Sequence, residues 1–297
     1  MSPSRIRNAR RYGSGGSSET ITKTSVPKGS ASAASAIEGY ELTKRGKANP
    51  TKATLAFSEA AAALGTNIKT GHDVKGLSQQ QDGSWQVISS QGEFRAKTLA
   101  LAVGAWSRPV GDMLGIDIPI TPIRGQMWAT EPVPPSIFHL IGSMESPFDW
   151  SSQPPSDDHP PEITHHGDTR ITRHLYGGQS RNGEIIFGGD RQSVGYDYSQ
   201  NAEGIEVNRG QASEVIPLVA KLPISRTWSG MMPFSMDGKP IIGKVPGFKN
   251  LFILTGLASS GFGRGPMAGK LLADYIHTSH PAPVLAESDP ARCITFK

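Results

Sequence analysis

The 297-residue sequence lacks the features that mark several large classes of protein. No run of roughly 18 apolar residues is present, so we expect no transmembrane segment and a soluble chain. A single cysteine, Cys293, excludes an internal disulfide framework and a Cys-x-x-Cys metal site. The histidines at His159, His165 and His166 lie in a proline-rich stretch without metal-ligand spacing, and no nucleophile elbow is visible. We therefore expect neither a metal site nor a hydrolase.

Net charge is also nearly absent outside the start of the chain. Residues 1–28 hold six basic residues and one acidic residue, whereas the remainder holds 24 basic and 25 acidic residues. The nearly neutral body gives no indication of a nucleic-acid-binding surface. Residues 1–36 are rich in Ser, Gly and Ala and show no apolar periodicity, which predicts a disordered leader. We expect a cytoplasmic protein, although the four early arginines leave organelle import open.

The first ordered segment mixes helix and strand signals. Asn49 and Pro50 form an N-cap and first-turn pair, which predicts a helix that ends at Gly65. Alternating apolar residues on both sides of a Gln-Gly turn predict a β-hairpin over 85–96. The unbroken apolar run 99–103 is typical of a strand covered on both faces, as in a parallel sheet.

The middle of the chain has the pattern of an antiparallel sheet, with one face packed and the other available to a ligand. Asn182-Gly183 between two β-like runs is a strong hairpin signal. The Pro-, Asp- and His-rich stretch 144–168 predicts a long surface loop. The remaining predictions are strands over 118–130 and 226–234, and a helix over 204–222 that Pro217 kinks.

The last third predicts a strand, a glycine-rich loop and a helix, in that order. A short apolar strand covers 251–254, small residues fill 255–265, and Gly265-Pro266 is expected to open the helix. Glycines allow a backbone to approach a flat ligand closely, and the first turn of a helix presents free N–H groups to an anion. A plain strand-to-helix connection would show the same residues.

Four stretches together resemble the FAD-dependent amine and amino-acid oxidoreductases, the superfamily of D-amino-acid oxidase, glycine oxidase and sarcosine oxidase. They are 74–77 (VKGL), 101–107 (LAVGAWS), 122–126 (PIRGQ) and 228–276, which includes 237–243 (DGKPIIG) and 261–269 (GFGRGPMAG). The segments keep the family's order over roughly residues 37–292.

The resemblance implies a mixed α/β fold with two domains. A partial, Rossmann-like FAD-binding domain would take 37–115 and 231–280, and an antiparallel or mixed-sheet substrate domain would take 116–230, with 144–168 as an insertion. Residues 281–297 would form a C-terminal tail. The implied reaction is hydride transfer from the carbon beside the nitrogen of a small-molecule amine to flavin N5, with dioxygen or another acceptor reoxidising the flavin. No cysteine lies near Met231, so the FAD would be held noncovalently.

Site residues follow from the same resemblance, although no catalytic residue is identified. Met232 stands where family members often have a carboxylate-binding arginine, which disfavours a free α-amino acid. Arg124 and Arg173 could bind an anion in its place, with surface or interdomain salt-bridge residues as the alternative. Tyr176 could line the substrate sheet and orient an amine with its hydroxyl, with a packed strand aromatic as the alternative. The expected flavin contacts are Val74 on the adenine side and Leu257, Ala258, Ser259, Ser260, Gly261, Phe262 and Gly263 on the isoalloxazine side.

The chain departs from the family at its start. Family members begin with a strand, a Gly-x-Gly-x-x-Gly loop, a helix and an acidic residue that binds the ribose, and none of these is recognisable here. Three explanations stay open: an incomplete product, a partner chain that supplies the missing half, or a non-catalytic remnant that binds a partner or nothing. The oligomeric state is not predicted.

Overall fold

A computed structural model describes residues 21–25, 38–42, 48–142, 165–166, 169–170 and 174–297, in two units considered separately: 1–48 and 49–297. In the first unit, strand β1 (Ile21–Ser25) pairs antiparallel with β2 (Glu38–Leu42). The prediction of disorder over 1–36 is therefore wrong at β1, whose β-branched residues suit a strand. The rest of that predicted leader lies outside the described residues.

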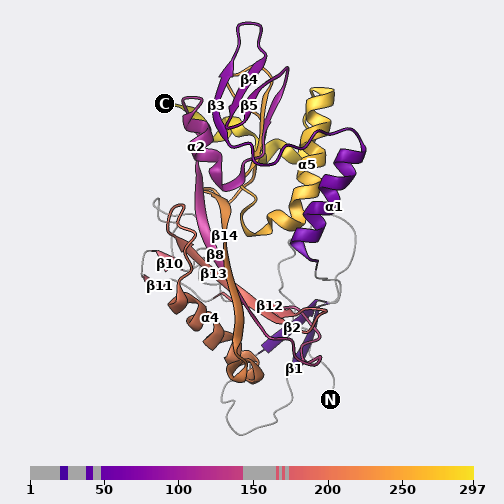
Figure 1. Ribbon diagram of the computed structural model, residues 1–297, viewed down its shortest axis with the longest axis vertical. Coiled ribbons are helices and arrows are strands. Elements are labelled where there is room, and N and C mark those ends of the chain that lie inside the picture. The colour runs from indigo at the N-terminus through magenta and orange to yellow at the C-terminus, as the bar shows by residue number, and fades with distance from the viewer. Residues whose placement is uncertain (1–20, 26–37, 43–47, 143–164, 167–168, 171–173) are drawn as a thin grey trace. The chain divides into compact units, whose positions relative to one another are not determined.

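The largest sheet of the second unit has seven strands and is built around the long pair β8 and β14 (Figure 1). Among the described residues, every strand pairing in it is antiparallel except that of β10 with β13, as the sequence predicts for this section. Most of the predicted loop 144–168 lies outside the described residues. The strands are β8 (Ile120–Thr130), β9 (Ile141–Gly142), β10 (His165–His166), β11 (Thr169–Arg170), β12 (Tyr176–Gln179), β13 (Ile185–Ser193) and β14 (Ile224–Ser235).

Helix α4 (Ala202–Val215) covers one face of this sheet. It packs on Trp128 and Phe187, both almost fully buried, and the indole N–H of Trp128 donates to Asn208 of the helix at 3.0 Å. The prediction of a kink at Pro217 is wrong, because the helix ends before it and a 3₁₀ turn, η2 (Pro217–Lys221), follows. Proline disfavours helical backbone in the residue before it, and Ile216 is accordingly non-helical.

Strand β13 contains a bulge at Gly189. Gly188 lies opposite Met127 and Asp190 lies opposite Gln126, so Gly189 is one residue too many for regular pairing. Its φ of +123° suits glycine, and a Cβ there would come within 2.8 Å of the His174 backbone oxygen. The bulge resets the alternation of side chains, so that Asp190 points toward α4.

A smaller sheet carries the parallel pairing. Strand β6 (Leu99–Leu101) runs parallel to β16 (Leu251–Thr255), and β15 (Ile241–Lys244) runs antiparallel to β16. After β6 come the short turn η1 (Gly104–Trp106) and α2 (Ser107–Asp112), and after β16 come η3 (Ala258–Ser260) and α5 (Gly261–Thr278). This is the α/β section expected from the apolar runs at 99–103 and 251–254.

The predicted hairpin over 85–96 forms, within a three-stranded antiparallel sheet. The helix predicted after Asn49 also forms, and the Asn49 side chain accepts from the Lys52 N–H at 2.9 Å. These elements are α1 (Pro50–Ala63), β3 (Val74–Gln79), β4 (Trp85–Ser89) and β5 (Gly92–Ala96). Near the C-terminus, η4 (Pro283–Ser288) and η5 (Pro290–Arg292) precede β17 (Thr295–Phe296), which pairs with β7 (Ile116–Asp117).

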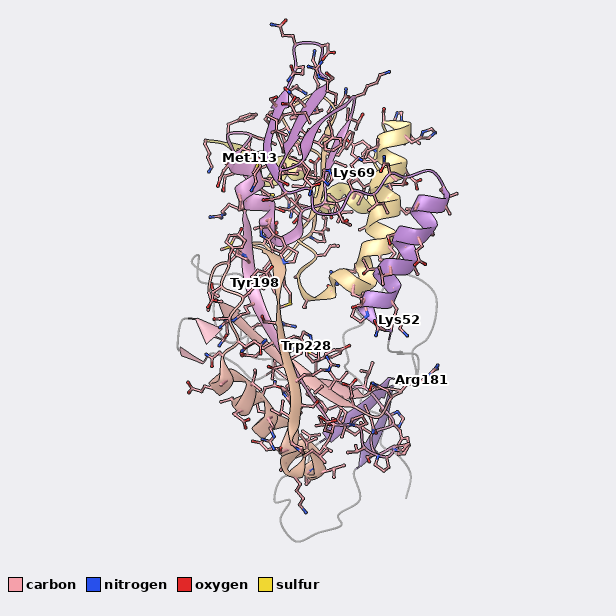
Figure 2. All side chains as sticks on the ribbon, in the orientation of Figure 1. Lys52, Lys69, Met113, Arg181, Tyr198 and Trp228 are labelled. Atoms are coloured by element: carbon pink, nitrogen blue, oxygen red, sulfur yellow. The ribbon has the colours of Figure 1, made fainter. Side chains whose placement is uncertain are left out.

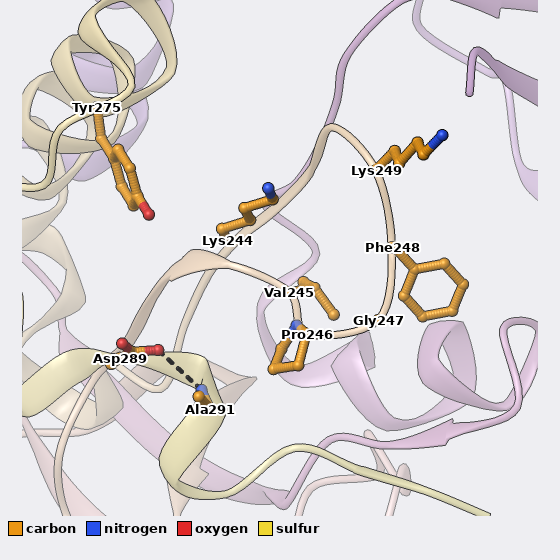
Figure 3. A pocket seen from close by; sticks show the side chains of 9 residues that line it. All are labelled: Lys244, Val245, Pro246, Gly247, Phe248, Lys249, Tyr275, Asp289 and Ala291. Atoms are coloured by element: carbon orange, nitrogen blue, oxygen red, sulfur yellow. Dashed lines mark hydrogen bonds between the residues drawn. The ribbon is translucent and has the colours of Figure 1, made fainter. Parts of the chain in front are cut away.

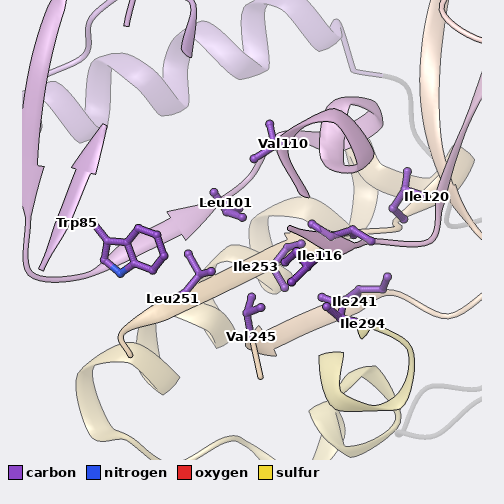
Figure 4. Close-up of a cluster of buried hydrophobic side chains, with 11 residues drawn as sticks. Trp85, Leu101, Val110, Ile116, Ile120, Ile241, Val245, Leu251, Ile253 and Ile294 are labelled. Atoms are coloured by element: carbon purple, nitrogen blue, oxygen red, sulfur yellow. The ribbon is translucent and has the colours of Figure 1, made fainter. Parts of the chain in front are cut away.

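One apolar cluster joins these smaller sheets (Figure 4). Trp85 of β4 is fully buried in it, and its indole N–H donates to the Lys249 carbonyl at 3.0 Å. Gln79 of β3 donates to the same oxygen at 2.6 Å. Among the helices that the structure describes, none combines the length and the apolar character that crossing a membrane requires.

We predict that Trp85→Phe lowers the free energy of unfolding by about 1–3 kcal/mol, because it removes buried volume and leaves the Lys249 carbonyl with one donor fewer. Urea unfolding measures the effect. The matched change Trp106→Phe, at a side chain that is 47% exposed, should cost less than about 1 kcal/mol. Equal losses in both variants would contradict the role given to Trp85.

Candidate functional site

The carboxyl ends of the parallel strands β6 and β16 meet at one edge of their sheet, where α/β folds commonly bind ligands. Two buried hydroxyls tie the loops that leave this edge. The Ser107 Oγ lies 2.8 Å from the Thr255 Oγ1, and the Thr255 hydroxyl donates to the Gly104 carbonyl at 3.1 Å. The sequence analysis missed this pair, although each residue is a small polar side chain that follows an apolar run.

Helix α5 begins at Gly261, so the prediction that Gly265-Pro266 opens it is wrong. The turn η3 runs directly into the helix, and Pro266 falls inside it, where its missing N–H removes one helical hydrogen bond. The glycine-rich stretch is therefore the first turn of the helix rather than a loop before it. Helix geometry leaves the first N–H groups, those of Gly261 to Gly263, without a partner in the helix itself.

The entrance to this first turn is open. Phe262 is 53% exposed, and a Cβ built on Gly263 or Gly265 would meet no atom within 4 Å. The first turn contains no acidic side chain that could occupy its donors. Open backbone donors at the positive end of a helix suit an anion or a group that becomes anionic.

The same loop touches the large sheet on the face away from α4. Ala258, whose φ is +48°, packs with Ile123, Met232 and Phe234. Met232 lies over Gly125, because a Cβ at Gly125 would come within 2.9 Å of the Met232 methyl carbon. The strand ends of β8 and β14 therefore stand beside the turn that leads into α5.

This second face, which we call the open face, consists of the residues that alternate with those packed on α4. Met127, Trp228 and Tyr176 share one cross-strand row on it, and each is partly exposed. Figure 2 labels Trp228 on β14, with Tyr198, whose carbonyl accepts from the Ser229 hydroxyl at 2.7 Å. A sheet with one packed face and one available face is what the sequence pattern predicts.

The predicted substrate residues divide between the two faces. Met232 and Tyr176 lie on the open face, and Tyr176 is 49% exposed. Arg124 lies on the α4 side and is 4% exposed, with its guanidinium bound to Gln192, Asp197 and Ser199. Its 3.1 Å contact with the Asp197 carboxylate is the salt bridge that the sequence analysis kept as the alternative.

The remaining predicted site residues lie in two separate parts of the fold. Val74 begins β3, in the three-stranded sheet rather than beside α5. Leu257 to Gly263 are contiguous at the entrance to α5. Arg173 lies outside the described residues.

A buried pair on the open face was missed. Arg191 is 7% exposed, and its Nη2 donates to the His174 Nε2 at 3.1 Å. Burial lowers the pKa of His174 to about 4, and the positive charge of Arg191 contributes to the shift. Regular alternation along β13 would place the Arg191 side chain on the side of α4. The sequence alone therefore predicts the wrong face, because the bulge at Gly189 is visible only in the structure.

A pocket of about 510 Å³ lies elsewhere, around the β15–β16 connection (Figure 3). Its lining includes Lys244, Lys249 and Tyr275, and Tyr275 follows Gly261 by 14 residues, or about 21 Å along α5. The pocket is therefore not part of the site at the start of the helix. Within the described residues, no group of three His, Cys, Asp or Glu side chains is placed to hold a metal ion.

Comparison with known proteins decides the family. The model of the family described as "FAD dependent oxidoreductase" (DAO) matches residues 4–275. The chain belongs to this family. The match includes most of the stretch 1–36, which the resemblance read from the sequence did not cover.

Two curated relatives show the range of the family. Glycine oxidase of Pseudomonas aeruginosa is 30% identical over 209 residues, which is 70% of this chain and 50% of the relative. Mitochondrial dimethylglycine dehydrogenase of Mus musculus is 27% identical over 266 residues, which is 83% of this chain and 28% of the relative. This chain spans half or less of the length of both relatives.

The solved structures agree in fold. L-proline dehydrogenase from P. horikoshii superposes with a TM-score of 0.69 at 25% identity, covering 86% of this chain and 63% of the other. Glycine oxidase from Geobacillus kaustophilus gives 0.63 at 20% identity, covering 80% and 56%. The mixed helix-and-sheet fold predicted from the sequence, with its largely antiparallel sheet, is confirmed.

The depressed pKa of His174 predicts a pH dependence of stability. Between pH of about 6.5 and 4, the unfolded chain takes up a proton at His174 that the folded chain excludes. The free energy of unfolding should therefore fall as the pH is lowered through this window, by about 1–3 kcal/mol in total. Urea unfolding of wild type and His174→Gln at several pH values measures it, and the variant should lose this component.

His280→Gln is the control for that measurement, because His280 is exposed on the surface after α5. It should reproduce the wild-type pH profile. A His174→Gln profile parallel to that of the wild type would show that His174 does not carry the effect.

Proposed function

We propose that this chain binds FAD noncovalently and takes part in oxidising the C–N bond of an amine or amino-acid-like substrate. The observation that supports this most directly is the open first turn of α5, where donors and space occur together beside the open face. Family membership supports the class of reaction. Because the chain spans half or less of the length of these curated relatives, the activity of the chain by itself belongs to the proposal.

The residues at the start of α5 fit the pyrimidine end of a flavin. Gly263 and Gly265 have free space where a side chain would stand, so a flat ring can approach the backbone. The N–H groups of Gly261, Phe262 and Gly263 are the predicted donors. When bound, the flavin would supply the hydride acceptor. Donors fixed in advance favour the negative charge that accompanies reduction.

The open face would hold the substrate against that ring. Met232 and Phe234 contribute apolar surface next to Ala258, and Tyr176 places a hydroxyl on the same face. Apolar walls exclude water from the reacting carbon, while Ser107 and Thr255 fix the two loops at the sheet edge. Dioxygen or another acceptor would take the electrons afterwards.

Gly263→Val tests the cofactor site. A Cβ at position 263 would meet no protein atom within 4 Å, and glycine is the poorest helix former after proline, so the variant should fold at least as well as the wild type. The same side chain would occupy the space proposed for the ring. We expect FAD affinity to fall at least about tenfold, measured by flavin fluorescence quenching on titration into the purified chain.

Gly269→Val is the matched control, because Gly269 is on the same helix, also has free space and lies beyond the first turn. It should leave FAD affinity unchanged. Purified wild type should be yellow and should release its flavin on acid treatment, as expected for noncovalent binding. A colourless wild type that takes up no FAD would favour the non-catalytic remnant instead.

A further inference from the structure

Helix α1 presents an apolar face to solvent. Four apolar residues recur at intervals that place them on one side of the helix, and we call them the α1 face: Ala53, Phe57, Ala60 and the C-cap residue Leu64. Such a stripe normally packs on a core, yet no residue of α1 is buried. Phe57 is 61% exposed and Leu64 is 89% exposed. Large apolar side chains gathered on one exposed side of an element are typical of a contact surface.

Two charged residues, Lys52 and Glu59, lie together along one side of this face. They are seven positions apart, which is about two helical turns, so their side chains leave the helix in nearly the same direction. Both are exposed, and neither has an ion-pair partner among the residues that the structure describes (Figure 2 labels Lys52).

The helix itself does not account for these charges. Residues seven positions apart are too distant for the ion pairs that stabilise a single helix, which join positions three or four apart. Lys52 also stands in the first turn, where the helix dipole disfavours a cation. Both charges are therefore available to a partner.

The order of the charges fits a second copy of the same helix. When two identical helices pack antiparallel about a two-fold axis, the start of each helix lies beside the end of the other. Lys52 of one copy then lies near Glu59 of the other, and the symmetry repeats the pair. A parallel arrangement would instead bring like charges together, lysine beside lysine and glutamate beside glutamate.

We propose that the α1 face is a dimer interface, on which a second copy of this chain packs its own α1 antiparallel. The apolar side chains supply the buried centre, while Lys52 and Glu59 set the direction of packing at the rim. One helix face is smaller than the roughly 800 Å² per partner of a standard interface, so the dimer is expected to be weak and in equilibrium with the monomer. No residue of the α1 face belongs to the proposed FAD site, so this inference does not rest on the proposed function.

Sedimentation velocity of the full chain over a range of micromolar concentrations tests the interface. Wild type should shift from monomer to dimer as its concentration rises and should form nothing larger, because a two-fold interface closes on itself. Phe57→Asp should weaken dimerisation at least about tenfold, since it places a charge in the apolar contact. Leu55→Asp is the matched control, because Leu55 is 54% exposed on the opposite side of α1, and it should dimerise as the wild type does.

Charge reversal tests the direction of packing. Lys52→Glu alone, or Glu59→Lys alone, should weaken the dimer about two- to tenfold, because each brings like charges together at both ends of the interface. The double variant Lys52→Glu/Glu59→Lys should recover the wild-type affinity, because the pairs form again in the opposite order. High salt should reduce the difference between the single variants and the wild type.

A chain that stays monomeric at every concentration would overturn the proposal and would leave the α1 face to another polypeptide. Equal loss of dimer in Phe57→Asp and Leu55→Asp would also overturn it, as would a double charge variant that binds no more tightly than the single ones. Circular dichroism verifies that each variant is folded. If Phe57→Asp does not fold, the charge series decides, and single variants that dimerise as the wild type does would contradict the antiparallel interface.

Discussion

The pairing of β8 with β14 is the constraint on which the rest of the second unit depends. Eleven residue pairs fix the register between these strands, and with it the face on which each side chain appears. One face carries Trp128 together with further aromatic and polar residues, and α4 covers this face. The other face remains available where it meets the turn before α5. The alternation of side chains along these strands therefore decides which residues can contact a ligand on this sheet.

Much of the fold follows from local signals. The Asn49-Pro50 cap, the Asn182-Gly183 hairpin and the apolar run at 99–103 predict elements that the structure contains, because each acts over a few residues. The start of α5 was placed too late for an equally local reason. Pro266 is a strong signal for a first turn, but the preceding 3₁₀ turn had already set helical backbone.

The candidate site was harder to predict, because it depends on pairing across strands. Arg124 and Arg191 cannot be distinguished from composition or spacing, yet they lie on opposite faces of one sheet. Only the register, including the bulge, separates a cation bound to Asp197 from one that faces the helix entrance. The link between Ser107 and Thr255 also could not be predicted locally, since the two residues are 148 positions apart in the sequence.

The bulge at Gly189 decides which of two neighbouring charges each face of the sheet displays. If Gly189 entered the ladder opposite Gln126, Asp190 would lie opposite Gly125 on the open face and Arg191 would lie opposite Arg124 on the side of α4. A deletion of Gly189 would instead remove the bulge and leave Asp190 and Arg191 opposite their present partners. The backbone conformation of one glycine, more than the order of the amino acids along the strand, therefore sets the electrostatic character of each surface.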